Sequence, residues 1–416
     1  MIKPNNSSHT YIFLTNSIGG ISGGSIYVRN KLMWLKETGW NVIAFDSTGI
    51  VYAPVVIEEL KPFANNRIRE LKFHPSWFTV SKRNKIVRRI YSKISDDNVV
   101  IETNNLLLAE WGEIFASKFG FKHLVFVIGE HERISNKSTL EFAVFKSVRM
   151  ELFSISPEAY RSLHPDFDSI DANNHWWNAK VDAPVCDIQC AYIDRLPYAD
   201  YTIGHFGRLK PYLINVLQAV DSYAKRNRSK TFNFVLMGTD SLVGHEKYLN
   251  ARNVNVVIVP RQYPLPLSFF KKCNVVFATA GCARIAFEQG AKVVAMNVKT
   301  HLPLGVLGYT TLNTTYGGGT QKEVFSIEYW LEQLLEKNAF SELQPMEFNY
   351  SQRAYDYQIQ YATFPDGHYF DVIDSGLGAP DNFKDAINKF LVKLNFTKLL
   401  SAYRRKRDEC NLKGHS

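Results

Sequence analysis

The chain has 416 residues, of which 45% are hydrophobic and 13% aromatic, a composition that can bury sizeable cores and that excludes general disorder. Its formal net charge of +9 favours acidic partners such as nucleic acid, an anionic membrane surface or a phosphorylated substrate. The sequence has no apolar run of the roughly 18 residues that a membrane span needs, and its five scattered cysteines indicate reduced thiols and a cytoplasmic location.

The first part of the chain predicts a doubly wound α/β domain. A strand at 11–15 leads into a glycine-rich loop, a helix that ends at Gly39 and a strand at 42–45. Strand, loop, helix and strand in this order begin such a domain. The alternation continues with strands at 99–102, 123–128 and 153–155 and helices at 107–118 and 157–163. We therefore predict a first domain over residues 1–195.

A second α/β series begins after the segment 164–200, which is rich in Asp, Pro and Asn and is expected to be irregular. Its predicted strands lie at 202–206, 233–237, 255–259, 275–278 and 293–296, and its helices at 213–226, 267–272, 281–289 and 321–336. We predict a second domain over residues 196–380, followed by a helix at 382–395.

Two segments of the second domain carry the residue types that hold a nucleotide diphosphate. Gly207 follows a strand, and Arg208 and Lys210 supply fixed cations beside it. Gly281 opens a helix whose first amides can face a phosphate. Glu288 lies about two turns further on, where a carboxylate can accept hydrogen bonds from ribose hydroxyls, as in dinucleotide-binding folds.

The segments 204–210 and 274–297 resemble the donor-nucleotide site of GT-B glycosyltransferases, especially the retaining family 4 type. The resemblance implies two Rossmann-like doubly wound domains facing a central cleft, with a C-terminal helix and basic tail at 381–416 that pack back on the first domain. It also implies a nucleotide-diphosphate sugar as co-substrate, with no metal or other cofactor required. Its implied donor-binding residues are Arg208, Lys210 and Glu288, with Gly238, Arg261, Gly281, Cys282, Ala283 and Arg284.

One position departs from this family's pattern. The family has a second Glu eight positions before the one that matches Glu288, and this chain has Ala280 there. Since that Glu usually contacts the donor sugar, Ala280 implies either that the backbone of 280–283 or Arg284 reads the sugar, or that turnover is lost.

The resemblance also points to two regions of the first domain. Gly20, Gly23 and Gly24 follow the first strand, where the family has a glycine loop against the donor phosphates; a plain strand–helix turn is the alternative. Glu130 and His131 follow a later strand, where the family has a histidine near the donor sugar, and we assign them the catalytic role. A solvated cluster of charged side chains is the alternative there.

A basic amphipathic helix is predicted at 82–93. Residues 71–95 contain seven basic side chains and no acidic one. Such a helix either lies on an anionic membrane surface or packs its apolar face on the core and leaves the basic face in solvent. Together with the basic cluster 404–407, it predicts peripheral association with the inner face of the plasma membrane. Nucleic acid is not an expected partner, because aromatic residues are not interleaved with the cations.

The preferred function, implied by the resemblance, is retaining transfer of a sugar to a saccharide or lipid-linked saccharide in bacterial surface polysaccharide synthesis. Two alternatives remain. One is a nucleotide-sugar 2-epimerase on the same scaffold, with Glu130 and His131 moving protons. The other is a non-catalytic subunit that binds a sugar or a partner transferase, which Ala280 favours.

Overall fold

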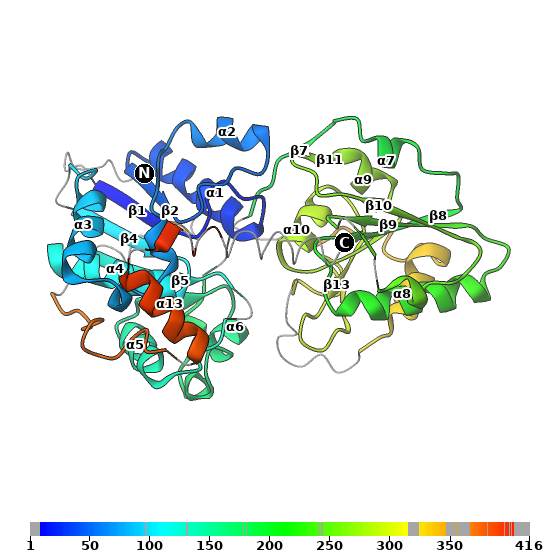
Figure 1. Cartoon of the computed structure of the whole chain (residues 1–416). Coiled ribbons are helices and arrows are strands. Elements are labelled where there is room, and N and C mark those ends of the chain that lie inside the picture. The colour runs from blue at the N-terminus through cyan, green and yellow to red at the C-terminus, as the bar shows by residue number, and fades with distance from the viewer. Residues whose placement is uncertain are drawn as a thin grey trace. The chain divides into compact units, whose positions relative to one another are not determined.

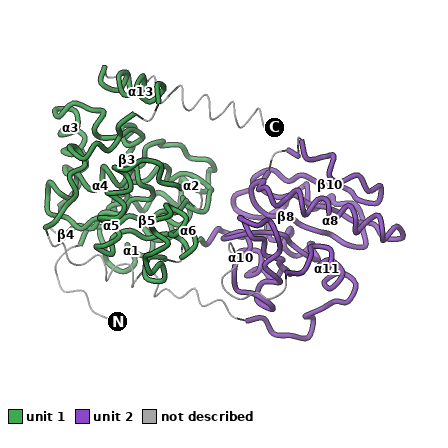
Figure 2. Tube along the Cα trace, turned by 90° about the horizontal axis from the view of Figure 1, so that it is seen from below, with its two compact units in different colours: residues 1–181, 350–408 green, residues 182–349, 409–416 purple. Residues whose placement is uncertain are grey.

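The chain divides into two compact units (Figure 2). Unit 1 contains residues 1–181 and 350–408, and unit 2 contains residues 182–349 and 409–416. The computed structural model describes residues 9–95, 98–129, 132–177, 179, 181–239, 241–242, 244–314, 324–346, 355, 367–380, 382–394, 396–398, 400 and 402.

Unit 1 is built on a parallel sheet with the strand order β3-β2-β1-β4-β5-β6 (Figure 1). Its strands are β1 (His9–Thr15), β2 (Asn41–Asp46), β3 (Ala64–Arg67), β4 (Asn98–Thr103), β5 (Lys122–Val127) and β6 (Leu152–Ser154). The order reverses between β1 and β4. Open α/β sheets bind ligands in the crevice that such a switch point opens at the carboxyl ends of the strands.

Helices cover both faces of this sheet. They are α1 (Gly23–Glu37), α2 (Pro54–Leu60), η1 (Arg69–Lys72), η2 (Pro75–Trp77), α3 (Val80–Tyr91), α4 (Leu106–Phe119), α5 (Lys137–Val148), α6 (Pro157–Arg161), η3 (Pro165–Ser169), η4 (Ala172–Asn174) and α13 (Phe383–Lys393). Ile12 and Leu14 of β1 lie in a hydrophobic cluster with residues of α3 and α4. Tyr11 and Phe13 instead lie near the ammonium group of Lys31 in α1. This alternation is that of a strand buried on both faces.

A buried ion pair ties α1 to the sheet. Lys31 Nζ lies 2.6 Å from Glu102 Oε2, and the hydroxyls of Tyr11 and Tyr27 donate to the same carboxylate at 2.6 and 3.0 Å. Both charged side chains are fully buried, and burial lowers the pKa of Lys31. Either charge alone would cost free energy in this buried position. The ion pair therefore holds α1, and with it the loop that precedes α1, against the sheet.

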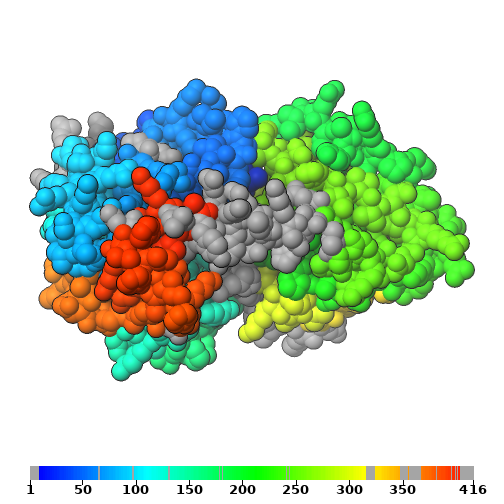
Figure 3. Space-filling view, viewed as in Figure 1, coloured from blue at the N-terminus to red at the C-terminus, as the bar shows by residue number. Residues whose placement is uncertain are grey.

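The C-terminal segment of unit 1 packs back on η2 and α3. Trp77 Nε1 donates to Gly378 O at 2.5 Å, and Val392 of α13 lies in the hydrophobic cluster that contains the apolar residues of α3. Figure 3 shows the orange and red C-terminal segment lying against the cyan segment that includes α3. The helix expected at 382–395 is therefore α13, and it packs on the first unit as the resemblance implied.

Unit 2 repeats the architecture with the strand order β10-β9-β8-β12-β13-β14, in which the β13–β14 pair is antiparallel and the other pairs are parallel. Its strands are β8 (Tyr201–Phe206), β9 (Phe232–Met237), β10 (Val254–Val259), β12 (Val275–Ala278), β13 (Val293–Met296) and β14 (Pro303–Val306), with β7 (Val185–Cys186) and β11 (Leu265–Pro266) in a separate pair. The switch point of this sheet lies between β8 and β12.

Helices also cover both faces of the second sheet. They are α7 (Ala191–Asp194), α8 (Tyr212–Arg226), η5 (Glu246–Tyr248), α9 (Leu267–Lys272), α10 (Ala280–Glu288), α11 (Ile327–Leu331) and η6 (Glu332–Glu336). Ile203 packs in a cluster with α8 and α11. On the opposite face, a Cβ at Gly204 would lie 3.0 Å from the ring of Phe269 in α9, so this strand position leaves room only for glycine.

The predicted α/β class with two doubly wound units is confirmed, with differences in detail. The helix expected at 321–336 is shorter: 324–326 precede it, α11 continues as the π-helical η6, and 321–323 lie outside the described residues.

The division of the chain differs from the expected boundaries after 195 and 380. Residues 182–195 belong to unit 2, because β7 pairs with β11 and Lys272 Nζ donates to Ile193 O at 2.7 Å. Residues 367–380 belong to unit 1, where Phe370 N donates to Glu113 Oε1 at 2.8 Å.

Candidate functional site

Three loops meet at the carboxyl edge of the sheet in unit 2, beside its switch point. Gly207 follows β8, Gly238 follows β9, and Cys282 lies in the first turn of α10 after β12. A Cβ at Gly238 would lie 3.0 Å from Gly207 O, and a Cβ at Gly207 would lie 3.3 Å from Cys282 Sγ. Both glycines have positive φ (127° and 102°), so close approach and backbone conformation together require glycine at these positions.

Cations and helix N-termini gather at the same edge. Arg208 is exposed and Lys210 is half-buried, and Lys210 O accepts from Leu213 N at 2.9 Å, which links this loop to the start of α8. Both α8 and α10 begin beside the switch point. The first amides of a helix lack intrahelical partners and carry a partial positive charge, so this edge suits an anionic group such as a diphosphate.

Glu288 is held by Arg284, one turn earlier in α10. The guanidinium of Arg284 is almost fully buried, with Nε 3.5 Å from Glu288 Oε1 and Nη2 3.5 Å from Asp182 Oδ1. The Glu288 side chain itself is 42% exposed, so its carboxylate remains accessible to a ligand. From the sequence, Arg284 is a candidate for contact with the donor sugar; the contact that the structure shows is instead with the carboxylate expected to bind the ribose.

Ala280 adopts the left-handed region with φ 51°, which is uncommon for a residue with a Cβ. Its amide donates to Thr314 O at 2.6 Å, and Thr279 Oγ1 donates to the same oxygen at 2.8 Å. Both contacts fasten the turn that enters α10. Strained backbone of this kind is often found at ligand sites.

The other expected donor residues of unit 2 occupy different surroundings. Ala283 is fully buried and its amide donates to Thr279 O, whereas Gly281 is half-buried in the first turn of α10. Arg261 is exposed after β10, which is separated from β8 by β9. Gly281 therefore lies beside the switch point, and Arg261 lies two strands from it.

The glycine loop of unit 1 is braced by a buried arginine. Arg29 Nη1 donates to Ile18 O at 2.7 Å and to Gly20 O at 2.5 Å, and its Nε lies 2.7 Å from Glu59 Oε2. A Cβ at Gly20 would lie 2.5 Å from Ser25 Oγ and would displace this hydroxyl, which donates to Ser17 O at 2.8 Å. The role of Arg29 could not be predicted from the sequence, because a basic residue within a helix gives no sign that it reaches back to the preceding loop.

Gly23 and Gly24 form the first residues of α1, next to that loop. A Cβ at Gly24 would lie 3.3 Å from Ile128, which follows β5, whereas a Cβ at Gly23 would have only ordinary contacts with Val181. Close packing therefore accounts for Gly24.

Two polar side chains at the switch point of unit 1 also escaped sequence analysis. Ser17 follows β1 and Asn104 follows β4, the two strands between which the order reverses. The Ser17 hydroxyl and both amide atoms of Asn104 are buried and have no hydrogen-bond partner in the structure as described. Buried polar atoms are usually paired, so these are candidates for ligand contacts. Their positions within two residues of a strand end were the available signal.

The proposed catalytic residues Glu130 and His131 lie outside the described residues, and their role stays a prediction. The next residue, Glu132, is described: its Oε1 accepts from Leu106 N at 2.9 Å, and burial raises its pKa.

The basic helix expected at 82–93 is α3, and its apolar face is used for packing. Ile86, Val87 and Ile90 are buried in the core of unit 1. Of the two expected arrangements, the structure therefore shows the core-packed one, with Lys85 and Arg88 exposed. The basic cluster 404–407 lies outside the described residues. None of the helices that the structure describes is long and apolar enough to cross a bilayer.

Comparisons with known proteins identify a fold. No family model matches the sequence, and no curated protein matches it. A crystal structure of HepE from Anabaena in complex with UDP matches with a TM-score of 0.53 and 15% identity, covering 88% of this chain and 97% of that one. A glycosyltransferase from Rickettsia africae matches with a TM-score of 0.49 and 11% identity, covering 96% of this chain and 98% of that one. A UDP-GlcNAc 2-epimerase from Neisseria meningitidis bound to UDP-GlcNAc matches with a TM-score of 0.45 and 12% identity, covering 85% of this chain and 99% of that one.

The sheet orders, the two doubly wound units and the match to the Anabaena structure agree with the expectation from sequence. The chain therefore has the GT-B fold of glycosyltransferases and related epimerases.

Proposed function

We propose that this protein is a glycosyltransferase that uses a nucleotide-diphosphate sugar as donor. The observation that supports the proposal most is the meeting of the Arg208 loop, the Gly238 turn and the start of α10 at the switch point of unit 2. Arg208 and Lys210 would pair with the diphosphate, and the N-terminal amides of α10 would bind its oxygens. Glu288, held by Arg284, would accept hydrogen bonds from the ribose.

Transfer with retention to a saccharide or lipid-linked saccharide, in bacterial surface polysaccharide synthesis, is the finer part of this proposal. The glycine loop braced by Arg29, with Ser17 and Asn104 beside it, would form part of the sugar and acceptor site in unit 1. Two solved structures with similar folds were obtained with UDP or UDP-GlcNAc, which supports a nucleotide sugar as partner. No metal is needed, because the cations and helix amides would stabilise the leaving diphosphate.

We also propose that the protein associates peripherally with the cytoplasmic face of a membrane, through electrostatic attraction alone. Since the apolar face of α3 is buried, the exposed basic face would contact anionic headgroups without insertion.

A non-catalytic subunit that binds a nucleotide sugar is the second candidate. The observation that favours it is Ala280, whose side chain offers no carboxylate to the donor sugar and whose amide is already bonded to Thr314. A nucleotide-sugar 2-epimerase remains the third, through Glu130 and His131.

One experiment separates the three candidates. The purified protein is incubated with a panel of UDP-, GDP-, ADP-, CMP- and dTDP-linked sugars, with and without saccharide acceptors, and the products are followed by NMR. The proposal predicts release of one nucleoside diphosphate and a product with the anomeric configuration of the donor. Inversion at C2 of the sugar would identify an epimerase, and binding without any turnover would identify the non-catalytic subunit.

A further inference from the structure

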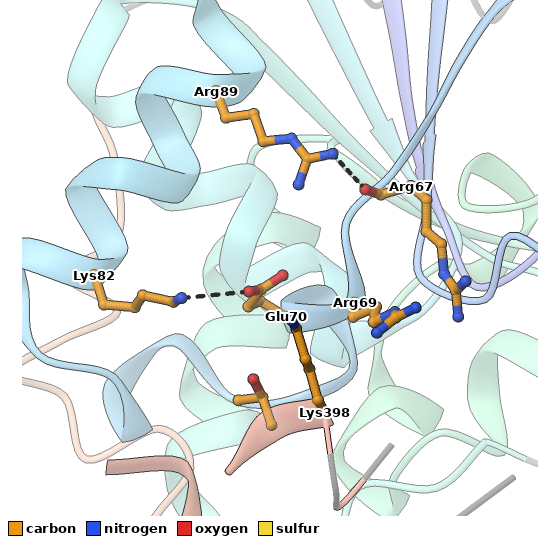
Figure 4. A pocket seen from close by; sticks show the side chains of 7 residues that line it. Arg67, Arg69, Glu70, Lys82, Arg89 and Lys398 are labelled. Carbon is orange, nitrogen blue, oxygen red and sulfur yellow. Dashed lines mark hydrogen bonds and ion pairs between the residues drawn. The ribbon is translucent and has the colours of Figure 1, made fainter. Parts of the chain in front are cut away.

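A cavity of about 740 Å³ lies in unit 1 between the end of β3, η1, α3 and the C-terminal segment (Figure 4). It is lined by Arg67, Arg69, Glu70, Lys82, Arg89, Thr397 and Lys398. In the sheet, β3 is separated from β1 by β2, so this cavity is distinct from the switch point of unit 1.

The cavity is strongly cationic. Its five basic side chains and one carboxylate leave an excess of four positive charges (five minus one). Glu70 Oε1 already lies 3.5 Å from Lys82 Nζ. Arg69 and Lys398 have no ion-pair partner among the residues that the structure describes. Like charges gathered in one cavity repel one another, and that repulsion is relieved when an anion binds between them.

The wall of the cavity is assembled from segments far apart in the sequence. Arg89 Nη2 donates to Arg67 O at 2.7 Å, which fastens α3 to the end of β3. Thr397 and Leu400 are buried on either side of Lys398, and Leu400 lies in the core cluster that includes α3. The backbone that carries Lys398 is thus anchored in the wall of the cavity.

The chemistry of the lining selects the class of ligand. Guanidinium and ammonium groups form charge-assisted hydrogen bonds with phosphate oxygens, and a guanidinium can bind two of them at once. The volume lies within the range of about 300–1,000 Å³ that is usual for small-molecule sites, so it accommodates a phosphate together with an attached group.

We propose that this cavity binds a phosphate ester, either free in solution or as the headgroup of a lipid. The site goes beyond the proposed transferase function, because it involves neither the nucleotide nor any residue of unit 2.

The proposal is tested with two probes: calorimetric titration with inorganic pyrophosphate, and sedimentation with phosphatidylcholine vesicles that contain phosphatidic acid. Vesicles with phosphatidylserine at equal surface charge serve as the reference. The cavity variant is Arg69→Gln/Lys398→Gln. The matched control is Arg252→Gln/Lys271→Gln, which removes the same charge from exposed positions of unit 2 that do not line the cavity.

We expect the affinity of the cavity variant for one of the two probes to fall at least about tenfold for each side chain removed. The affinity of the control should stay within about twofold of that of the wild type. A loss seen with pyrophosphate assigns the site to a soluble phosphate ester. A loss seen only with phosphatidic acid, relative to phosphatidylserine, assigns it to a lipid headgroup.

Three results would overturn the proposal. They are binding of neither probe by the wild type, equal loss in the cavity variant and the control, and pyrophosphate binding that Arg208→Ala abolishes while the cavity variant keeps it. The last result would place the phosphate site in unit 2 and would leave the proposed transferase function intact.

Discussion

At the scale of single residues, the pairing of Arg284 with Glu288 carries the clearest consequence for ligand binding. Arg284 is too deeply buried to offer a wide surface to a ligand, yet it lies 3.5 Å from the carboxylate expected to bind the ribose. We therefore assign it a positioning role. A change at Arg284 should act on binding through Glu288.

The positioning role of Arg284 is tested with Arg284→Met, Glu288→Gln and the double variant. Each single change should weaken nucleotide binding, and the double change should cost less than the sum, with a coupling free energy of about 0.5–3 kcal/mol. Calorimetry on the four proteins measures it, with thermal unfolding to show that they remain folded. Strictly additive losses would mean that Arg284 does not act through Glu288.

The buried side chain of His205 should make the stability of the folded state depend on pH. It is fully buried in β8, with Nε2 3.2 Å from the Tyr212 hydroxyl, and burial lowers its pKa to about 4. An unfolded histidine titrates near 6.5, so between these values the unfolded chain binds the extra proton. The folded state should therefore lose stability as the pH falls from about 6.5 towards 4, by an amount on the order of 3 kcal/mol from this residue.

The test compares urea unfolding of the wild type and His205→Phe at neutral and acidic pH. The variant should show a smaller loss of stability on acidification, whatever its stability at neutral pH. If the wild type and the variant lost the same amount of stability between neutral and acidic pH, His205 would contribute nothing to the acid sensitivity.

At the scale of elements, the docking of the C-terminal segment depends on Gly378. Its φ is 72°, and a Cβ there would lie 2.5 Å from His74 Cβ. Gly367 also has a positive φ (78°), but a Cβ there would meet no atom of the described residues within 4 Å. The two glycines therefore share the conformational penalty of about 1–2 kcal/mol for alanine, and only Gly378 adds a clash.

We predict that Gly378→Ala loosens the segment 367–398 and that Gly367→Ala does so much less. Hydrogen exchange and limited proteolysis of this segment measure the difference. Equal exchange in the two variants would show that the close contact with His74 is not what holds the segment.

Several elements could be predicted from sequence because their patterns are local. The strands at 275–278 and 293–296 and the helix at 267–272 coincide with β12, β13 and α9, since short apolar runs between polar and glycine positions define them. By contrast, β3 has the sequence ANNR, which carries no apolar pattern and pairs with β2 only in the folded sheet.

The candidate site divides in the same way. Arg208, Lys210 and Glu288 could be proposed from their positions after a strand and within a helix, and from the resemblance, and their roles stay predictions. The bracing contacts of Arg29 and Arg284 depend on side chains that reach back to a loop or across the start of unit 2, and the conformation of Ala280 depends on Thr314. Such contacts are tertiary, so no periodicity in the sequence predicts them.

At the scale of the whole molecule, each unit has hydrophobic clusters of its own, and we therefore expect two unfolding transitions. Glu102→Gln leaves the buried Lys31 without its countercharge and should destabilise unit 1 by about 3–5 kcal/mol. Differential scanning calorimetry should show one transition lowered and the other retained. A single transition that moves as a whole would show that the two units unfold together.

We propose that the carboxyl edge of unit 2 binds the nucleotide of the donor. Calorimetric titration of UDP, GDP, ADP, CDP and dTDP into the wild type, Arg208→Ala, Glu288→Gln and a control, Arg252→Ala, tests this binding. Arg252 is exposed and precedes β10, at the opposite edge of the sheet. We predict that one nucleotide binds, that Arg208→Ala and Glu288→Gln each weaken it by about 1.5–3 kcal/mol, and that Arg252→Ala leaves it unchanged. Binding of none of the five by the wild type, or equal affinity in all four proteins, would contradict the account.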